Sequence, residues 1–229
     1  MLAAAPLAAQ APAASPAPPV AVSGLFVTRY LYQLTDTANH ANAFDITRAY
    51  LTVTGKFPGG LATRVTLDLF TNADSSRAYR IKYAYAAYTP GKSPLTCKIG
   101  VIHTPWLDWE EALWEYRMQG TMAMERGGYL SSSDFGAGVD GKWGPDRVNA
   151  QVAVVNGEGY NRGAGDQRKD IMGRASVRVR DTNDSSRVGG LRLTAYGQYG
   201  KPTSGGERQR WLLMASYKSK QVTAAVQAG

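Results

Sequence analysis

Basic side chains recur at every second position in several stretches of this 229-residue chain. Near residue 177, for example, Arg174, Arg178 and Arg180 share one parity, while Val177 and Val179 take the other. Rows of guanidinium and ammonium groups bind oxyanions through charge-assisted hydrogen bonds and need no covalent step. The chemistry indicated is therefore reversible anion binding, provided that an extended strand collects the charges on one face.

The stretch 79–86 shows the same alternation with aromatic residues. The apolar parity holds Tyr79, Ile81, Tyr83 and Tyr85, and the other parity holds Arg80, Lys82, Ala84 and Ala86. In a transmembrane β-barrel the apolar face meets lipid and the charged face lines a water-filled lumen. We expect all four residues of the apolar parity to face the lipid.

Strand-length segments of this kind follow one another from residue 22 onward. We expect strands over 22–35, 43–55, 61–71, 77–89, 95–104, 133–143, 147–156, 171–181, 188–199, 209–218 and 221–229. The segment 211–218 (WLLMASYK) does not alternate cleanly, so its facing stays unassigned. The connectors are alternately long and short, as in outer-membrane barrels with short periplasmic turns and longer outer loops. The fold class predicted is an all-β, antiparallel, up-and-down transmembrane barrel.

Composition agrees with this fold class. The 25 glycines and 13 tyrosines suit many short strands, no apolar run is long enough for a membrane helix, and the net charge is +8. The single cysteine, Cys97, stands on the apolar parity with Leu95 and Ile99, and with two histidines it makes no zinc-like cluster. Eleven segments are an odd number, and the last reads as mid-strand, so we expect a fragment that lacks later strands.

Residues 1–21 form an uncharged Ala/Pro-rich leader with an A-x-A sequence at Ala9–Ala11. Such a segment is typical of the end of a secretory signal followed by a linker, although the positively charged start of a signal is absent. The alternative is a low-complexity N-terminus without a targeting role. The domain division expected is therefore a leader over 1–21 and a partial barrel over 22–229.

The stretch from about 44 to 160 resembles the phosphate-selective porin O/P family of Gram-negative outer membranes. The matching segments are FDITRAYLTVTG (44–55), RIKYAYAAY (80–88), KIGVIHTPW (98–106), WEYR (114–117), SSDFGAGVDGKWG (132–144) and VVNGEGY (154–160). The resemblance implies a trimeric barrel of about 16 to 18 strands that passes anions through a lumen lined by basic residues. It also implies an outer-membrane location, with membrane lipid and a homotrimer as partners.

The connector 105–132 is the longest and holds a Trp-rich acidic run that favours a short helix. By the resemblance it is a loop that folds into the lumen and narrows it, where a pore discriminates between solutes. Its candidate residues are Trp106, Asp108, Trp109, Glu110, Glu111, Glu115 and Arg117. We expect the carboxylates to pair with basic residues of the wall, and the alternative is direct contact with a permeating solute.

The anion pathway is predicted from basic residues on the lumen parity: Arg64, Arg80, Lys82, Lys98, Arg174, Arg178, Arg180 and Arg192. Their surplus over acidic residues should concentrate anions, whereas pairing with Asp68, Asp134 and Asp140 would remove selectivity. Phosphate is one candidate solute among several.

The function expected is passive diffusion of small anions, without catalysis or cofactor. No nucleophile and base stand together, and aromatic residues opposite the charges disfavour nucleic-acid binding. The alternatives are a non-selective or plugged structural barrel, an outer-membrane enzyme, and a soluble β-barrel binding module.

Overall fold

Eleven strands form one sheet in the computed structural model, which describes residues 19–163, 166–202 and 204–229. The strands are β1 (Val20–Tyr32), β2 (Asn42–Phe57), β3 (Leu61–Thr71), β4 (Arg77–Tyr88), β5 (Leu95–His103), β6 (Ser133–Trp143), β7 (Val148–Val155), β8 (Asp170–Arg180), β9 (Gly190–Gly200), β10 (Arg208–Lys218) and β11 (Thr223–Ala228). Each predicted strand is found, with ends that differ by at most three residues.

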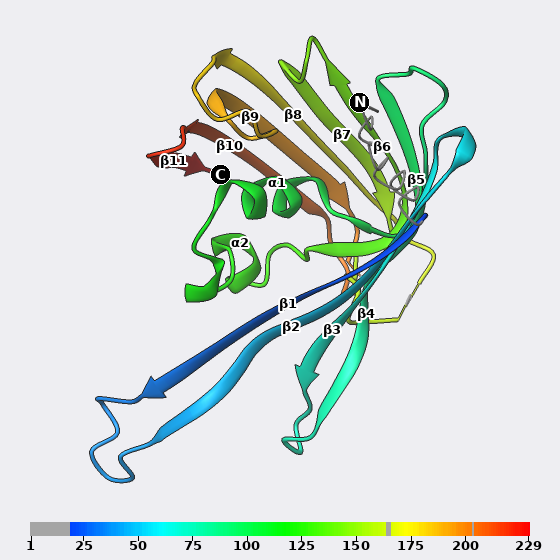
Figure 1. The fold of residues 1–229 in the computed structure, drawn as a ribbon. Helices are drawn as coiled ribbons and strands as arrows, with labels where there is room; N and C mark the ends of the chain where they lie inside the picture. The colour runs from blue at the N-terminus through cyan, green and yellow to red at the C-terminus, as the bar shows by residue number, and fades with distance from the viewer. Residues whose placement is uncertain (1–18, 164–165, 203) are drawn as a thin grey trace, which may run out of the picture.

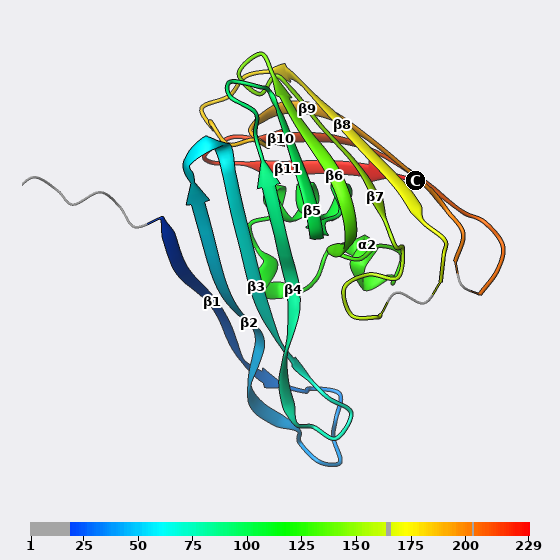
Figure 2. The same ribbon diagram turned by 90° about the vertical axis from the view of Figure 1, so that its right-hand side faces the viewer.

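The strands pair antiparallel in chain order, so that β1 and β11 are the two edges of the sheet (Figures 1 and 2). The expected alternation of long and short connectors holds only in part: the 3₁₀ turn η1 (Pro58–Gly60) is short, but 72–76 is shorter than 89–94, and 181–189 is longer than 201–207. Because the order is an uninterrupted meander, successive connectors lie at opposite rims, and the two longest, 104–132 and 156–169, share one rim, which we call the rim of the longer connectors. The predicted all-β, up-and-down architecture is confirmed.

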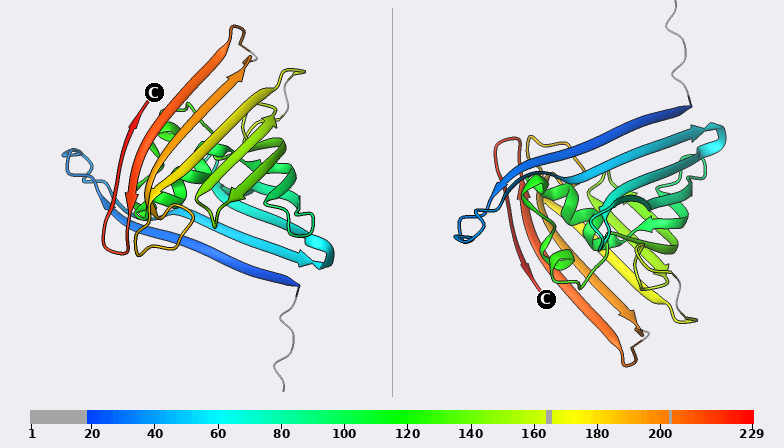
Figure 3. Two further views of the ribbon diagram at one scale, coloured as in Figure 1. Left: turned by 90° about the horizontal axis from the view of Figure 1, so that it is seen from above. Right: turned by 90° about the horizontal axis from the view of Figure 1, so that it is seen from below.

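Seen from above and from below, the sheet curves around the connector 104–132 (Figure 3). This connector holds the helix α1 (Pro105–Leu113), the 3₁₀ turn η2 (Arg117–Gln119) and the short helix α2 (Ala123–Arg126). Pro105 opens α1 at a position where its missing N–H is no loss. The sheet thus has a concave face that carries the connector and a convex face, in the form of a partial barrel.

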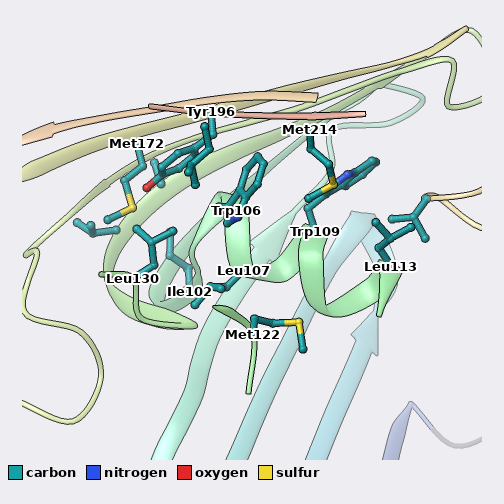
Figure 4. Close-up of a cluster of buried hydrophobic side chains, with 14 residues drawn as sticks. Ile102, Trp106, Leu107, Trp109, Leu113, Met122, Leu130, Met172, Tyr196 and Met214 are labelled. Carbon is teal, nitrogen blue, oxygen red and sulfur yellow. The ribbon is translucent and has the colours of Figure 1, made fainter. Parts of the chain in front are cut away.

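A hydrophobic cluster joins α1 to the concave face (Figure 4). Trp106, Leu107 and Trp109 have no exposed surface, and they pack against apolar side chains of β5, β8, β9 and β10. Met172 of β8 and Met214 of β10 belong to this cluster. Removing this much aromatic surface from water is what keeps the connector against the sheet.

Alternation between the two faces is clear on most strands. On β10, Leu212 and Met214 are buried on the concave side, whereas Trp211 and Leu213 are 63% and 54% exposed. The facing that the sequence left unassigned is therefore regular. Cys97 is exposed, as Leu95 and Ile99 of the same parity are, in agreement with the predicted parity.

The prediction for β4 is wrong beyond Ile81, because a β-bulge shifts its parity. Thr66 pairs with Tyr83 and Leu67 with Ile81, which leaves Lys82 as the extra residue. Tyr79 and Ile81 are exposed, but Tyr83 is 4% exposed and lies with Lys82 on the concave side. Tyr85 follows Tyr83 to that side.

A second bulge corrects the prediction for Arg180. The register skips Val179, so Arg178 pairs with Arg192 but Arg180 pairs with Leu191. Residues directly opposite in a sheet share a face, and Leu191 has the parity of the exposed, convex Leu193. Arg180 therefore belongs to the convex register.

The predicted export leader lies almost entirely in residues 1–18, outside the described residues. Val20 and Ala21, assigned to the linker from sequence, already belong to β1. Over the described ranges, no helix combines the length and the apolar character that crossing a membrane requires.

Candidate functional site

Two adjoining cavities lie between α1 and the concave face. Their volumes are about 340 and 330 Å³, and both are lined by Arg64, His103, Asp108 and Arg187. Four basic side chains and two carboxylates line the first, and five basic side chains and two carboxylates line the second. The walls of both cavities therefore carry a surplus of positive charge.

Arg64 of β3 reaches the boundary between these cavities. Its Nε donates a hydrogen bond to Thr66 Oγ1 at 3.0 Å, and its Nη1 lies 3.3 Å from His103 Nε2. The guanidinium stands 4.7 Å from the ring centroid of Tyr83, and that ring stacks on His103 with 3.9 Å between centroids. These contacts hold Arg64 in one orientation while no carboxylate neutralises it in the described chain.

Lys82 owes its place in the first cavity to the bulge in β4. It is 2% exposed, and its Nζ donates to Tyr50 Oη at 2.8 Å and lies 4.6 Å from the Tyr50 ring. A buried ammonium needs such partners because it has lost part of its hydration. Tyr50 of β2 is therefore a functional residue that the sequence reasoning missed.

Asp108 of α1 is fixed by Arg187, which lies in the connector between β8 and β9. Arg187 Nη1 donates to Asp108 Oδ2 and Arg187 Nη2 to the Asp108 carbonyl oxygen, both at 2.6 Å. Burial opposes ionisation of Asp108, but the neighbouring His103 and the Arg187 guanidinium together outweigh it and hold the pKa of the carboxyl below its ordinary range. Asp108 is thus a permanent anion inside a cationic site.

Trp109 makes cation–π contacts with three guanidinium groups. The Cζ atoms of Arg174, Arg192 and Arg187 lie 4.1, 5.3 and 5.8 Å from its ring centroid. Arg174 also donates to the Pro105 carbonyl oxygen at 3.0 Å and to Asn149 Oδ1 at 2.6 Å. The indole face offsets part of the repulsion among these like charges.

Among the remaining carboxylates of the connector, Glu115 bears out the predicted pairing with the wall, because it pairs with Lys218 of β10. Glu111 instead pairs with Arg117 at 2.5 Å within the connector itself. Glu110 behaves differently. Burial, assisted by the charges of Glu111 and Glu125, raises the pKa of Glu110 to about 7.

The predicted basic residues are gathered only in part. Arg64, Lys82, Lys98 and Arg174 line the two cavities. Lys98 pairs there with Asp140, so its charge is compensated locally.

The others lie apart from the cavities. Arg80 pairs with Asp68 at 3.0 Å, nearer the rim of the longer connectors. Arg178 and Arg192 share Asp146 at 3.8 and 3.4 Å, at the opposite rim. Arg180, displaced by its bulge, lies on the convex register and makes no ion pair within the described part of the chain.

Two further residues, Arg187 and His103, were not predicted as members of the site. Arg187 lies in a connector, where the parity of strands gives no information. His103 has the parity of Val101, so alternation alone placed it on the convex side, whereas it lines both cavities. The one sequence feature that pointed to them was the acidic run of the connector 105–132, because buried carboxylates require cationic partners.

This arrangement suits weak binding of hydrated anions. Several fixed cations line the two adjoining cavities, and the carboxylate of Asp108 lies among them. An anion in either cavity is therefore not surrounded by cations on all sides and can leave again. Over the described residues, no three His, Cys, Asp or Glu side chains are grouped to hold a metal ion.

Comparison with known proteins gives one positive finding. A family model described as "Phosphate-selective porin O and P" matches residues 25–201. This range extends beyond the stretch that carried the resemblance in the sequence and includes every residue of the two cavities except Ser23 and Gly24. A search of curated proteins gives no match.

Proposed function

The chain belongs to the phosphate-selective porin O and P family, and from this premise we propose that it forms a passive outer-membrane channel for small anions. Phosphate is the solute that the description of the family supports. The proposal includes export to the outer membrane and assembly as a homotrimer, both inferred from the family.

The observation that carries the proposal is the surplus of basic side chains in the two cavities beneath α1. Narrow aqueous space between low-dielectric walls focuses such a field, which raises the local concentration of anions and lowers that of cations. Arg64 matters most in this argument, because its contacts are neutral and its full charge remains available to a solute.

The two faces of the sheet support the membrane part of the proposal. The convex face exposes large apolar side chains such as Ile99, Leu193 and Trp211, each more than half exposed. The concave face carries the charged side chains that line the two cavities. This division suits a wall with lipid on one side and water on the other.

In the proposed channel, α1 narrows the path. Its apolar side packs on β8–β10, and Asp108 and Glu111 point toward the cationic side. A solute that passes between α1 and β3–β5 would meet Arg64 and Lys82 on one wall and Arg187 on the other. Exchange between adjacent cations lets an anion leave as readily as it enters.

The same anchored connector favours one alternative, a plugged structural barrel. Efflux from proteoliposomes separates the two. The channel predicts rapid efflux of labelled phosphate, slower efflux of labelled rubidium, and a loss of the difference in Arg64→Gln. A plugged barrel predicts that both labels stay inside, and faster loss of rubidium would refute anion preference.

A further inference from the structure

A third cavity, larger than the two beneath α1, lies apart from them. It has a volume of about 650 Å³ and lies at the rim of the longer connectors. Most of its lining comes from the segment after α2, the turn 157–162 that follows β7, and the ends of β9 and β10. Arg80, Thr104, Glu125, Asp134 and Met172 complete it. Its volume is in the range of sites for organic ligands and is far too large for a lone inorganic ion.

One cation in this cavity is held in place yet keeps its charge. Arg210 Nη1 donates to Gln198 Oε1 at 3.3 Å, and over the described chain Arg210 has no carboxylate in an ion pair. Gln198 is itself fixed, because Tyr196 Oη donates to its Oε1 at 3.1 Å and its Nε2 donates to Asp170 Oδ2 at 2.6 Å. A rigid cation of this kind binds an anion with little loss of conformational entropy.

The neighbouring Arg208 stabilises the wall of the cavity and does not offer a free charge. Arg208 Nη1 donates to Asp170 Oδ2 at 2.5 Å and to the Gly157 carbonyl oxygen at 2.9 Å. Its charge is thereby compensated. Arg162, exposed at the end of the turn, lines the same cavity and adds a second cation from the other side.

Two tyrosine rings give the cavity an aromatic surface beside its cations. Tyr129 is 57% exposed, and its ring lies 6.0 Å from the Arg210 guanidinium. Tyr160 lines the same cavity and donates its hydroxyl hydrogen to Asp68 at 3.1 Å. Aromatic faces beside hydrogen-bonding groups such as Ser131 bind the ring of a sugar, which is apolar on its faces and polar on its edge.

The turn that closes the cavity is built rigidly. Asp134 accepts backbone hydrogen bonds from Gly157 at 2.8 Å and Gly159 at 3.1 Å. Both glycines have positive φ, and a Cβ at Gly159 would lie 2.7 Å from Ser131 Oγ. These contacts fix the position of the turn on one side of the cavity.

We propose that this cavity is a binding site for phosphorylated sugars, with the phosphate on Arg210 and Arg162 and the ring on Tyr129. The site goes beyond the passage of small anions and does not depend on it, because binding at the rim needs no open path. Its ligand differs from inorganic phosphate by the ring, and from a neutral sugar by the charge.

Isothermal titration calorimetry of the full chain in detergent micelles tests this assignment, with glucose 6-phosphate, inorganic phosphate and glucose as probes. The expected result is that glucose 6-phosphate binds more tightly than either other probe. Arg210→Gln should weaken its binding about tenfold or more, the usual effect of losing a hydrogen bond to a charged group. Arg147→Gln, an exposed arginine in the turn at the opposite rim, is the matched control and should bind normally.

Tyr129→Ala separates the two halves of the ligand. Because Tyr129 is largely exposed, its loss leaves the fold intact, and it should weaken glucose 6-phosphate while leaving inorganic phosphate unchanged. Three results would overturn the proposal: equal affinity for glucose 6-phosphate and inorganic phosphate, equal affinity for glucose 6-phosphate and glucose, or wild-type binding by Arg210→Gln. Calorimetry detects binding whether or not the protein conducts, so failure here is distinct from failure of the channel function.

Discussion

Asp108→Asn is the substitution that most sharply probes the cationic cavities. The asparagine keeps the size of the side chain, and its Oδ1 still accepts a hydrogen bond from Arg187. The change removes one of the two carboxylates that line each cavity. It leaves the five basic side chains of the second cavity, Arg187 among them, facing a single carboxylate, Asp140.

The expected effect on anion affinity follows from Coulomb's law. Removing a negative charge about 4 Å from a bound anion relieves about 4 kcal/mol of repulsion at an effective dielectric constant of about 20. Water and salt in the cavities screen this interaction. Even about a third of that value is a factor of roughly ten in affinity. We therefore expect Asp108→Asn to bind phosphate about tenfold more tightly.

Current recordings in planar bilayers measure this change. Phosphate added to a chloride solution should reduce the current at an about tenfold lower concentration in Asp108→Asn than in the wild type. Glu115→Gln is the control, since Glu115 pairs with Lys218 and its side chain is 57% exposed. An unchanged or weaker effect of phosphate in Asp108→Asn would refute the assigned role of this carboxylate.

Three further predictions concern the connector and the rim. Because the pKa of Glu110 is raised, its protonation stabilises the native state fully below about pH 4.5, and this stabilisation is lost as the pH rises through about 7. The midpoint temperature of thermal unfolding should therefore rise when the wild type is acidified from about pH 7 to about pH 4.5. The midpoint of Glu110→Gln should not rise in this way. Trp109→Ala should lower the free energy of unfolding in denaturant by about 3–5 kcal/mol, because its indole has no exposed surface, whereas Trp114→Ala, 47% exposed, should cost much less; equal losses would contradict the packing. Gly159→Ala places a Cβ at φ +82° and should weaken hydrogen-exchange protection of the turn by about 1–3 kcal/mol, whereas Gly163→Ala, with open space around it, should not.

Alternation predicts the strands of this protein well because each strand separates two different environments. Thr66 and Asp68 of β3 are buried on the concave side while Val65 is 43% exposed, as the sequence pattern indicates. Alternation does not predict bulges, since one extra residue leaves no mark in composition. The bulge at Lys82 therefore reversed the expected facing of Tyr83 and Tyr85.

The site was predictable only where it lies on regular strands. Arg64, Lys98 and Arg174 follow from parity, and the acidic run of α1 correctly indicated basic partners. The partner of Asp108 is Arg187, 79 residues away in a connector, and no local pattern reveals a contact of this sequence separation. Packing of Trp109 across the sheet creates that contact.

The reversal potential under a salt gradient tests the central claim most directly. The full protein is inserted into a planar bilayer with potassium chloride more concentrated on one side, and the voltage of zero current is measured. A surplus of fixed positive charge along the concave face predicts a potential of the sign set by chloride, reduced in Arg64→Gln. A potential of the sign set by potassium, or the absence of current, would contradict the account.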